Sequence, residues 1–187
     1  MFPALWLLTY TGMRRGECLG LIWKNVELEP HKISITQSLV RSADKGLIIE
    51  PPKTRSSRRT IDIDDDTVRV LQQHKVAQAE DRIFLVPPYV DVDLVFPNRF
   101  GKPLNPMSLT RTLEKVVRRA EVPKMRLHDF RHFHVSVLIQ QGESSVMISK
   151  RLGHSNPSMT LDIYGHHMPG WQREAAESFA SAMRRIS

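Results

Sequence analysis

The sequence predicts a mainly helical (α+β) domain with one small antiparallel β-sheet. Apolar residues recur at helical spacing in several stretches, most clearly at Leu109 and Leu113 within residues 106–120. Alternating β-branched residues, which are typical of strands, occur only in short runs such as residues 32–36. The 187 residues are expected to form one domain that is long enough to bury a core, since no repeat or low-complexity linker divides them.

In the first half of the chain, helices and strands are expected to alternate. The expected helices cover residues 3–9, 15–23 and 64–79, and the expected strands cover residues 32–36, 47–50 and 59–63. Gly12 separates the first two helices, and the third begins at Asp64 because carboxylates favour the N-terminal end of a helix. The strands would form one sheet, with residues 53–58 as its exposed hairpin tip.

The second half is expected to be helical after an irregular, proline-containing segment at residues 83–98. A helix over residues 129–141 is stopped by Gly142, and Ser144 or Ser145 caps the next helix. The inward side chains of that helix are Val146, Ile148 and Leu152. A final helix carries one apolar stripe, formed by Trp171, Ala175, Phe179, Ala182 and Ile186.

Net charge and cysteine content narrow the range of partners and compartments. The formal net charge is +7 and the pI is about 9.9, so polyanions are the first partners to consider. The single cysteine, Cys18, allows no internal disulfide, fits a reducing cytoplasm and is expected to fill a core position. No apolar run approaches the roughly 20 residues of a membrane span, and residues 1–9 do not resemble a signal peptide.

Most side chains that could act on a phosphate ester lie between residues 126 and 164. His128 and Arg131 are three residues apart and therefore share one face of a helix. His154 lies in a turn, and Tyr164 closes the stretch. Arginine is a permanently charged fork of donors, histidine can give or take a proton, and tyrosine can act as a nucleophile. This combination suggests phosphate chemistry.

Three motifs together resemble those of the tyrosine recombinases, or phage integrases. The second motif block of that family is similar to H-D-F-R-H at residues 128–132 and L-G-H-S at residues 152–155, followed by Tyr164. Its first block is similar to T-G-M-R-R-G-E at residues 11–17, and its β-hairpin lysine is similar to P-K-T at residues 52–54. The motifs stand in the order found in the family and span nearly the whole chain.

The resemblance implies that residues 1–187 form a tyrosine recombinase catalytic domain with a C-terminal helical tail at residues 169–187. It also implies that the DNA-clamping domain and the first part of the catalytic domain are absent from this sequence. The implied activity is site-specific DNA recombination, which integrates or excises a phage or another mobile element. The implied catalytic residues are Arg14, Lys53, His128, Arg131, His154 and Tyr164.

The implied reaction is a transesterification at a DNA phosphodiester. Tyr164 attacks the phosphorus, which leaves a 3′-phosphotyrosine link and a free 5′-hydroxyl, and Lys53 protonates the departing oxygen. Arg14 and Arg131 clamp the non-bridging oxygens, where negative charge develops. Because one ester replaces another, the resemblance implies that no nucleotide, metal ion or other cofactor is needed.

The remaining implied roles belong to two histidines, two carboxylates and a set of surface arginines. His128 assists proton transfer, and His154 donates a hydrogen bond to a phosphate oxygen. Glu17 lies one turn beyond Arg14 and would hold it by an ion pair, whereas Asp129 would cap its own helix. Contacts with the DNA backbone are expected from Arg15, Arg55, Arg58 and Arg59.

The implied partners are double-stranded DNA and further recombinase subunits, assembled as a tetramer on the DNA. The C-terminal helix would dock in a neighbouring subunit or fold back on its own domain. The expected location is the cytoplasm of a bacterium, in association with bacterial or phage DNA, and no membrane partner is expected.

Three other functions stay open. Residues 146–164 could form a helix-turn-helix that reads the major groove without catalysis, although this leaves Arg14 and Lys53 unexplained. A metal hydrolase is suggested by His128 and His132 at positions i and i+4, but the glutamate of H-E-x-x-H and an obvious third ligand are missing. A type IB topoisomerase would share the recombinase chemistry and would relax DNA instead of exchanging strands.

Overall fold

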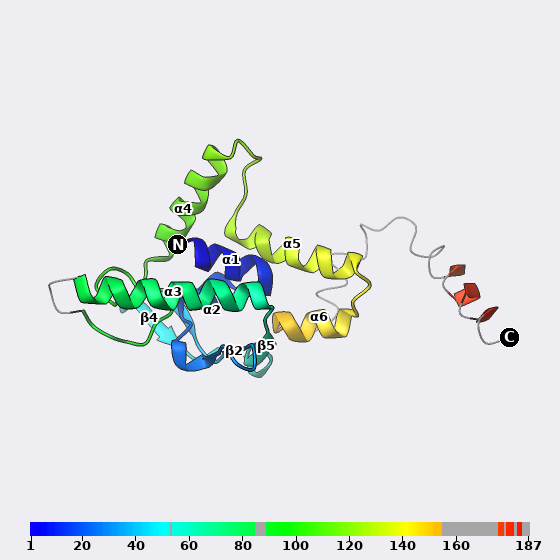
Figure 1. Ribbon diagram of the computed structural model, residues 1–187, viewed down its shortest axis with the longest axis horizontal. Helices are drawn as coiled ribbons and strands as arrows, with labels where there is room; N and C mark the ends of the chain where they lie inside the picture. Colours follow the sequence, from blue (N-terminus) through cyan, green and yellow to red (C-terminus); the bar gives the residue numbers. More distant parts are fainter. Residues whose placement is uncertain (53, 85–88, 155–175, 178, 182, 185–187) are drawn as a thin grey trace.

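A computed structural model describes residues 1–52, 54–84 and 89–154, and residues 176–177, 179–181 and 183–184 of the C-terminal tail (Figure 1). It is mainly helical with small antiparallel sheets, as the sequence predicts. The helices are α1 (Phe2–Thr11), α2 (Arg15–Leu19), α3 (Asp65–Phe84), α4 (Pro106–Arg119), α5 (Leu127–Gln140) and α6 (Ser145–Leu152). The strands are β1 (Val26–Glu27), β2 (Lys32–Ile35), β3 (Ser38–Ser42), β4 (Gly46–Glu50) and β5 (Arg59–Asp62). Two 3₁₀ helices are η1 (Trp23–Asn25) and η2 (Arg55–Ser57).

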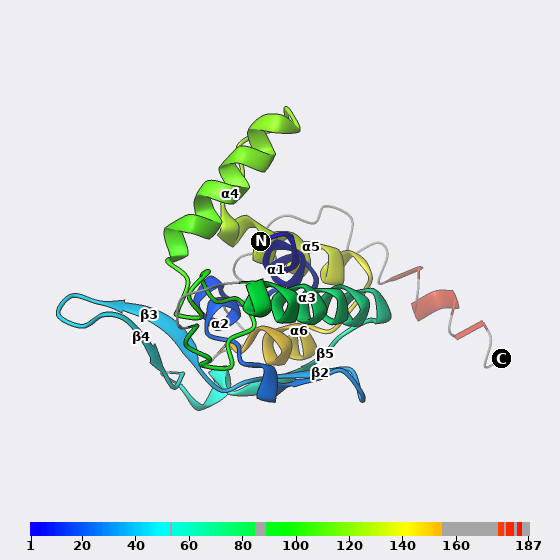
Figure 2. The same cartoon turned by 60° about the vertical axis from the view of Figure 1, so that its left-hand side comes forward.

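The strands form two small sheets instead of the single predicted sheet. β2 pairs with β1 and with β5, whereas β3 and β4 pair with each other as a ribbon that extends from the body (Figure 2). The chain between β4 and β5 therefore connects two sheets and is not the tip of a hairpin. The single-sheet prediction is wrong because β3 has a weak signal of its own. Only Leu39 and Val40 are apolar in it, and its pairing with β4 decides the arrangement.

The main core lies where α1, α2 and the three-stranded sheet meet. Its fully buried residues include Leu7, Leu19, Ile33 and Ile61, and Cys18 is also fully buried, as the sequence predicts. Burying side chains of this size stabilises the fold by roughly 1.5–3 kcal/mol each. α1 also contacts α3 and α5, so the N-terminal helix links the first half of the chain to α5 in the second half (Figure 1).

Two helices have boundaries that differ from those predicted. α2 ends at Leu19, earlier than expected, because Ile22 pairs with Leu94 in an isolated bridge and must be extended. α3 runs past its predicted end and reaches Phe84. Residues 83–84, which were predicted to be irregular, are therefore helical, and the predicted irregular character is confirmed for residues 89–98.

The three helices from α4 to α6 agree with the predicted ones. In Figure 2, α4 stands away from the body, while α5 and α6 lie against it. The hydroxyl of Ser144 caps α6 by accepting the Met147 N–H at 3.2 Å, and Ile148 and Leu152 are fully buried. Val146 was expected to face inward but is 50% exposed, because its position lies on the opposite side of the helix from those two residues.

The described residues of the tail are helical, and Phe179 is 68% exposed. The other members of the predicted apolar stripe lie outside the described residues: Trp171, Ala175, Ala182 and Ile186. The stripe therefore stays a prediction. Among the helices that the structure describes, none is long and apolar enough to cross a membrane.

Candidate functional site

The guanidinium of Arg131 is buried and connects three helices. Arg131 belongs to α5; its Nη1 donates to the Gly12 carbonyl at 2.6 Å, and its Nη2 donates to the Leu152 carbonyl at 2.8 Å. These carbonyls lie at the ends of α1 and α6. Gly12 has a φ of 63°, and a Cβ there would lie 2.8 Å from the His134 ring. Glycine is therefore required where the chain turns from α1 toward Arg14.

Arg14 stands at the N-cap of α2, and its side chain is held by Glu17. Arg14 Nη1 donates to Glu17 Oε1 at 2.9 Å, and the Arg14 backbone N–H donates to Oε2 at 2.9 Å. The ion pair expected from the sequence is therefore present. The Arg14 side chain is 42% exposed and that of Glu17 only 4%, so a buried carboxylate anchors a guanidinium that solvent can reach.

Arg14, His128 and Arg131 line one cleft of about 500 Å³. Its remaining charged residues are Arg15, Glu114, Lys124 and Arg126. The last two were not singled out from the sequence, although they immediately precede the H-D-F-R-H motif and lie within its basic surroundings. An excess of cationic groups around a cleft favours an anionic ligand such as a phosphate group.

His154 lies near the same arginines, just after the end of α6. Its backbone N–H donates to the Ser149 carbonyl at 3.0 Å, which fixes the turn that carries it. Burial, and then the positive charges of Arg131, Arg14 and Arg59, lower the pKa of His154 to about 4. The imidazole is therefore neutral at pH 7, with one donor and one acceptor nitrogen.

His128 lies on α5, one turn before Arg131, and contacts a second histidine. The rings of His128 and His132 meet edge to face, with their centroids 4.6 Å apart. Burial, and then the neighbouring His132 and Arg131, lower the pKa of His128. Nearby positive charges thus lower the pKa of both predicted histidines of the site, and the same charges would attract a bound phosphate.

Arg59, which was expected to contact the DNA backbone, is buried. Its side chain is 6% exposed, and its Nη2 pairs with Glu17 Oε2 at 2.9 Å. Arg59 does not line the cleft, and its guanidinium is neutralised by the carboxylate of Glu17, so the expected DNA contact from Arg59 is corrected to a buried ion pair. Neighbouring residues of an extended chain point to opposite sides, which is why Arg58 is exposed.

The other predicted residues occupy varied places. Asp129 caps α5 by accepting the Arg126 backbone N–H at 2.8 Å, as expected. Arg15 is exposed and donates to the Thr110 hydroxyl at 3.4 Å. Three predicted groups lie outside the described residues: Lys53, Tyr164 and the side chain of Arg55. Their roles stay predictions.

The structure adds no support for the metal hydrolase or for the helix-turn-helix module. In the described part of the chain, no group of three His, Cys, Asp or Glu side chains is placed to hold a metal ion. The second helix of a helix-turn-helix would follow residue 154 and falls outside the described residues.

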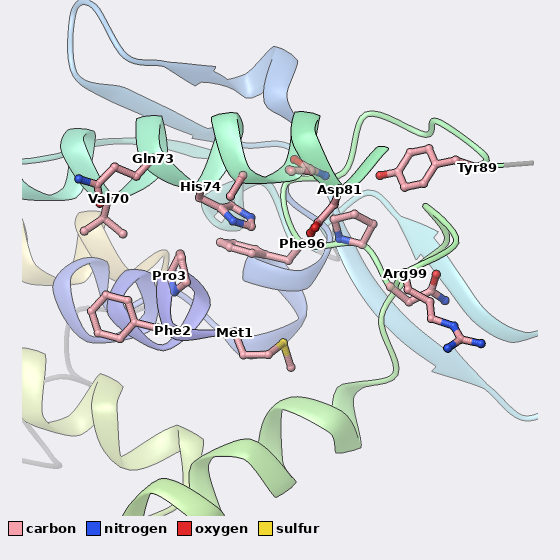
Figure 3. Close-up of a pocket in the computed structure, with 14 residues that line it drawn as sticks. Met1, Phe2, Pro3, Val70, Gln73, His74, Asp81, Tyr89, Phe96 and Arg99 are labelled. Carbon is pink, nitrogen blue, oxygen red and sulfur yellow. The ribbon is translucent and has the colours of Figure 1, made fainter. Parts of the chain in front are cut away.

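A larger hollow of about 720 Å³ lies between the start of α1, α3 and residues 89–99 (Figure 3). Phe2, Val70 and Phe96 supply apolar walls, and His74 and Asp81 are among its polar groups. The lining includes none of the predicted catalytic residues that the structure describes. Size therefore does not identify the candidate site; the cluster of cationic side chains does.

Comparison with known proteins identifies the family. The sequence pattern of the phage integrase family matches residues 3–170, which include all three motifs. The chain belongs to the phage integrase family. A tyrosine recombinase XerC-like protein of Caldanaerobacter subterraneus subsp. tengcongensis is 32% identical over 94% of this chain and 48% of its own length. The ICEBs1 integrase of Bacillus subtilis is 33% identical over 89% of this chain and 45% of its own length.

The chain thus spans about half the length of the curated relatives it matches. Solved structures show that the predicted fold is correct. The Tn1549 transposon integrase, in complex with a circular intermediate DNA, has a TM-score of 0.78 and 24% identity, covering 100% of this chain and 58% of that chain. XerA recombinase has a TM-score of 0.66 and 22% identity, covering 92% of this chain and 55% of that chain.

Proposed function

We propose that this phage integrase family member breaks and rejoins DNA strands by transesterification, with Tyr164 as the nucleophile. The observation that carries the proposal is the convergence of Arg14, His128 and Arg131 on one cleft, with His154 beside them. Arg14 comes from the first motif block, and the other three residues come from the second block, which begins more than 100 positions later. Packing alone does not require that two guanidinium groups and two imidazoles meet at one surface.

In the proposed reaction, the cleft binds the phosphodiester that is cleaved. A five-coordinate phosphorus gains negative charge on its non-bridging oxygens, and Arg14 and Arg131 would neutralise that charge. A pre-placed donor of this kind contributes on the order of 3 kcal/mol to transition-state stabilisation. The neutral imidazoles of His128 and His154 would donate hydrogen bonds or relay a proton without adding repulsion to the cationic cleft.

The chemical step exchanges one phosphate ester for another. The Tyr164 oxygen bonds to phosphorus, the bond from phosphorus to the 5′ oxygen breaks, and Lys53 gives that oxygen a proton. Forming the phenolate at pH 7 costs about 4 kcal/mol from a reference pKa near 10, so the cationic cleft must lower that cost. The phosphotyrosine link keeps the energy of the original ester, and attack by a 5′-hydroxyl rejoins the strand without an added cofactor.

The proposed substrate is double-stranded DNA, and the proposed biological role is site-specific recombination of a mobile element. The names of its relatives support this role, since they are recombinases, integrases and transposases. The exposed side chains of Arg15 and Arg58, together with Arg55, are proposed to contact the DNA backbone. Recombination exchanges strands between two sites, so we further propose a tetramer on DNA in the bacterial cytoplasm.

The test uses a pool of DNA duplexes with a randomised centre. Each duplex carries a nick close to the randomised bases, so that a short cleaved piece with its 5′-hydroxyl diffuses away and the covalent adduct is trapped. We expect the 187-residue chain to form an adduct that survives denaturing electrophoresis in the presence of EDTA. The selected duplex then serves for rate measurements.

The matched variants are Arg14→Lys in the cleft and Arg69→Lys on the exposed face of α3. Losing the guanidinium fork of Arg14 should slow adduct formation by about 100-fold, whereas the Arg69 variant should match the wild type. Binding to the pool without any adduct would contradict the proposal and favour a DNA-binding module. Relaxation of a supercoiled plasmid without strand exchange between two selected duplexes would favour the topoisomerase alternative.

A further inference from the structure

The side chain of Arg59 joins three segments of the chain. It lies at the start of β5 and is almost completely buried. Nε donates to the Arg151 carbonyl at 2.6 Å, Nη1 donates to the Ser57 carbonyl at 3.1 Å, and both Nη atoms donate to the carboxylate of Glu17. One buried group therefore fixes α2, the end of α6 and the chain before β5 in relation to one another.

Each carboxylate oxygen of Glu17 accepts one hydrogen bond from Arg14 and one from Arg59. Oε1 accepts from Arg14 Nη1 at 2.9 Å and from Arg59 Nη1 at 3.2 Å. Oε2 accepts from the Arg14 backbone N–H at 2.9 Å and from Arg59 Nη2 at 2.9 Å. Burial alone would raise the pKa of Glu17, but the hydrogen bonds and charges of Arg59 and Arg14 hold it below its ordinary value. The position of Arg14 thus depends on Arg59, which binds the same carboxylate.

Arg59 also supports the turn that leads to His154. The carbonyl of Arg151 lies in the last turn of α6, where carbonyls have no helical N–H partner, and it accepts from Arg59 Nε. Gly153 follows with a φ of 67°, and a Cβ at that position would lie 2.8 Å from Arg59 Nη1. The turn therefore packs directly against the guanidinium.

We propose that Arg59 is a positioning residue, which holds Arg14 through Glu17 and holds His154 through the end of α6. This inference rests on the proposed function, because it assigns these groups to one phosphate site. An ammonium group could replace the charge of Arg59. It could not direct donors from three fixed nitrogens toward Glu17, Arg151 and Ser57 at once, as the planar fork does.

The first test measures an anion site without relying on DNA cleavage. Orthovanadate, a phosphate analogue that accepts five-coordinate geometry, is titrated into the protein and followed by ⁵¹V NMR. We expect Arg59→Lys and Arg14→Lys each to weaken vanadate binding by about tenfold, the effect of losing one well-directed charge-assisted contact. Arg69→Lys, which keeps the same charge on an exposed site, should bind like the wild type. Thermal unfolding of each variant verifies that it is folded at the temperature of the titration.

The second test distinguishes positioning from general destabilisation. Single-turnover adduct formation is compared on the selected duplex with a normal phosphate and with an uncharged methylphosphonate at the cleaved position. The methylphosphonate lacks the charge that Arg14 would neutralise. The rate loss in Arg59→Lys should therefore shrink on this substrate, as it should in Arg14→Lys. The Kd for DNA should change by no more than about twofold, because buried Arg59 makes no backbone contact.

The outcomes of these tests distinguish the positioning role of Arg59 from the proposed DNA-cleaving function. Unchanged vanadate binding in Arg59→Lys, or an equal rate loss on both substrates, would overturn the positioning role even if DNA is cleaved. If the wild type forms no adduct but Arg59→Lys still weakens vanadate binding, the proposed function fails and the positioning of an anion site stands.

Discussion

Arg151 donates its Nε–H to Nε2 of His134 at 3.1 Å, and this contact fixes the protonation state of the imidazole. The other ring nitrogen, Nδ1, lies 3.1 Å from the Thr9 carbonyl, which can only accept. Nδ1 therefore carries the hydrogen and Nε2 the lone pair, so His134 is neutral. Burial, and then the charge of Arg151, lower the pKa of His134 to about 4.

This contact predicts a loss of stability in acid. The pKa of His134 is lower in the folded chain than the ordinary value of 6.5, so its contribution to stability is complete above pH 6.5 and is lost as the pH falls toward 4. Urea unfolding at pH 7.5 and pH 4.5 should show a contribution on the order of 2 kcal/mol, allowing for partial solvent screening. His134→Gln, which keeps one donor and one acceptor, should flatten this dependence. The control His31→Gln, whose side chain is 42% exposed, should keep this pH dependence. Equal slopes in all three proteins would contradict the assignment.

Removing the charge of Glu17 should destabilise the fold. Glu17→Gln leaves two arginines around a neutral side chain, and breaking a buried ion pair from one side costs about 3 kcal/mol. Urea unfolding at pH 7 measures the change. Asp66→Asn removes a carboxylate from the exposed pair with Arg69 and should have little effect. Similar losses in both variants would show that the Glu17 cluster does not support the fold.

Lys53 should matter only for the protonation of the leaving oxygen. Lys53→Ala should slow adduct formation on a normal phosphodiester by about 100-fold, within the range of general acid catalysis. A duplex with sulfur in place of the 5′ bridging oxygen should restore most of the rate, because a thiolate leaves without a proton. Arg14→Lys should gain no such recovery. If the sulfur substrate fails to restore Lys53→Ala, another residue is the general acid.

The C-terminal tail is predicted to mediate assembly. Deletion of residues 169–187 should reduce the size of the protein–DNA complex in sedimentation velocity, since it removes the apolar side chains expected to dock in a neighbouring subunit. A variant with Phe179→Ser alone should weaken assembly in the same direction, because this side chain is 68% exposed. Complexes of equal mass with and without the tail would contradict docking in a neighbour.

The helices, and the meeting of Arg14 with His128 and Arg131 at one cleft, were predictable from the sequence. The spacing of His128 and Arg131 fixes their common helix face, and the fixed order of the motifs indicated that Arg14 belongs with them. The strand pairing was not predictable in the same way. It depends on a contact between β3 and β4, and Leu39 and Val40 are too few apolar residues to reveal β3 locally.

The role of Arg59 was also not predictable from the sequence. In the sequence it is one of several arginines on a basic stretch and looks like a surface group. Its burial follows from the register of β5 against β2, where Arg59 pairs with Ile35, and from a carboxylate 42 positions earlier. Local patterns do not contain either relationship. Lys124 and Arg126 were missed for a related reason, because only the folded chain places them on the cleft.

The role of Tyr164 as the nucleophile is tested most directly by identifying the residue that becomes linked to DNA. The adduct formed on the selected duplex is digested with protease and nuclease, and the modified peptide is sequenced by mass spectrometry. We expect a 3′-phosphate ester on Tyr164, loss of the adduct in Tyr164→Phe and an unchanged yield in the control Tyr10→Phe. An adduct that persists in Tyr164→Phe, or a link through a 5′-phosphate, would contradict this expectation.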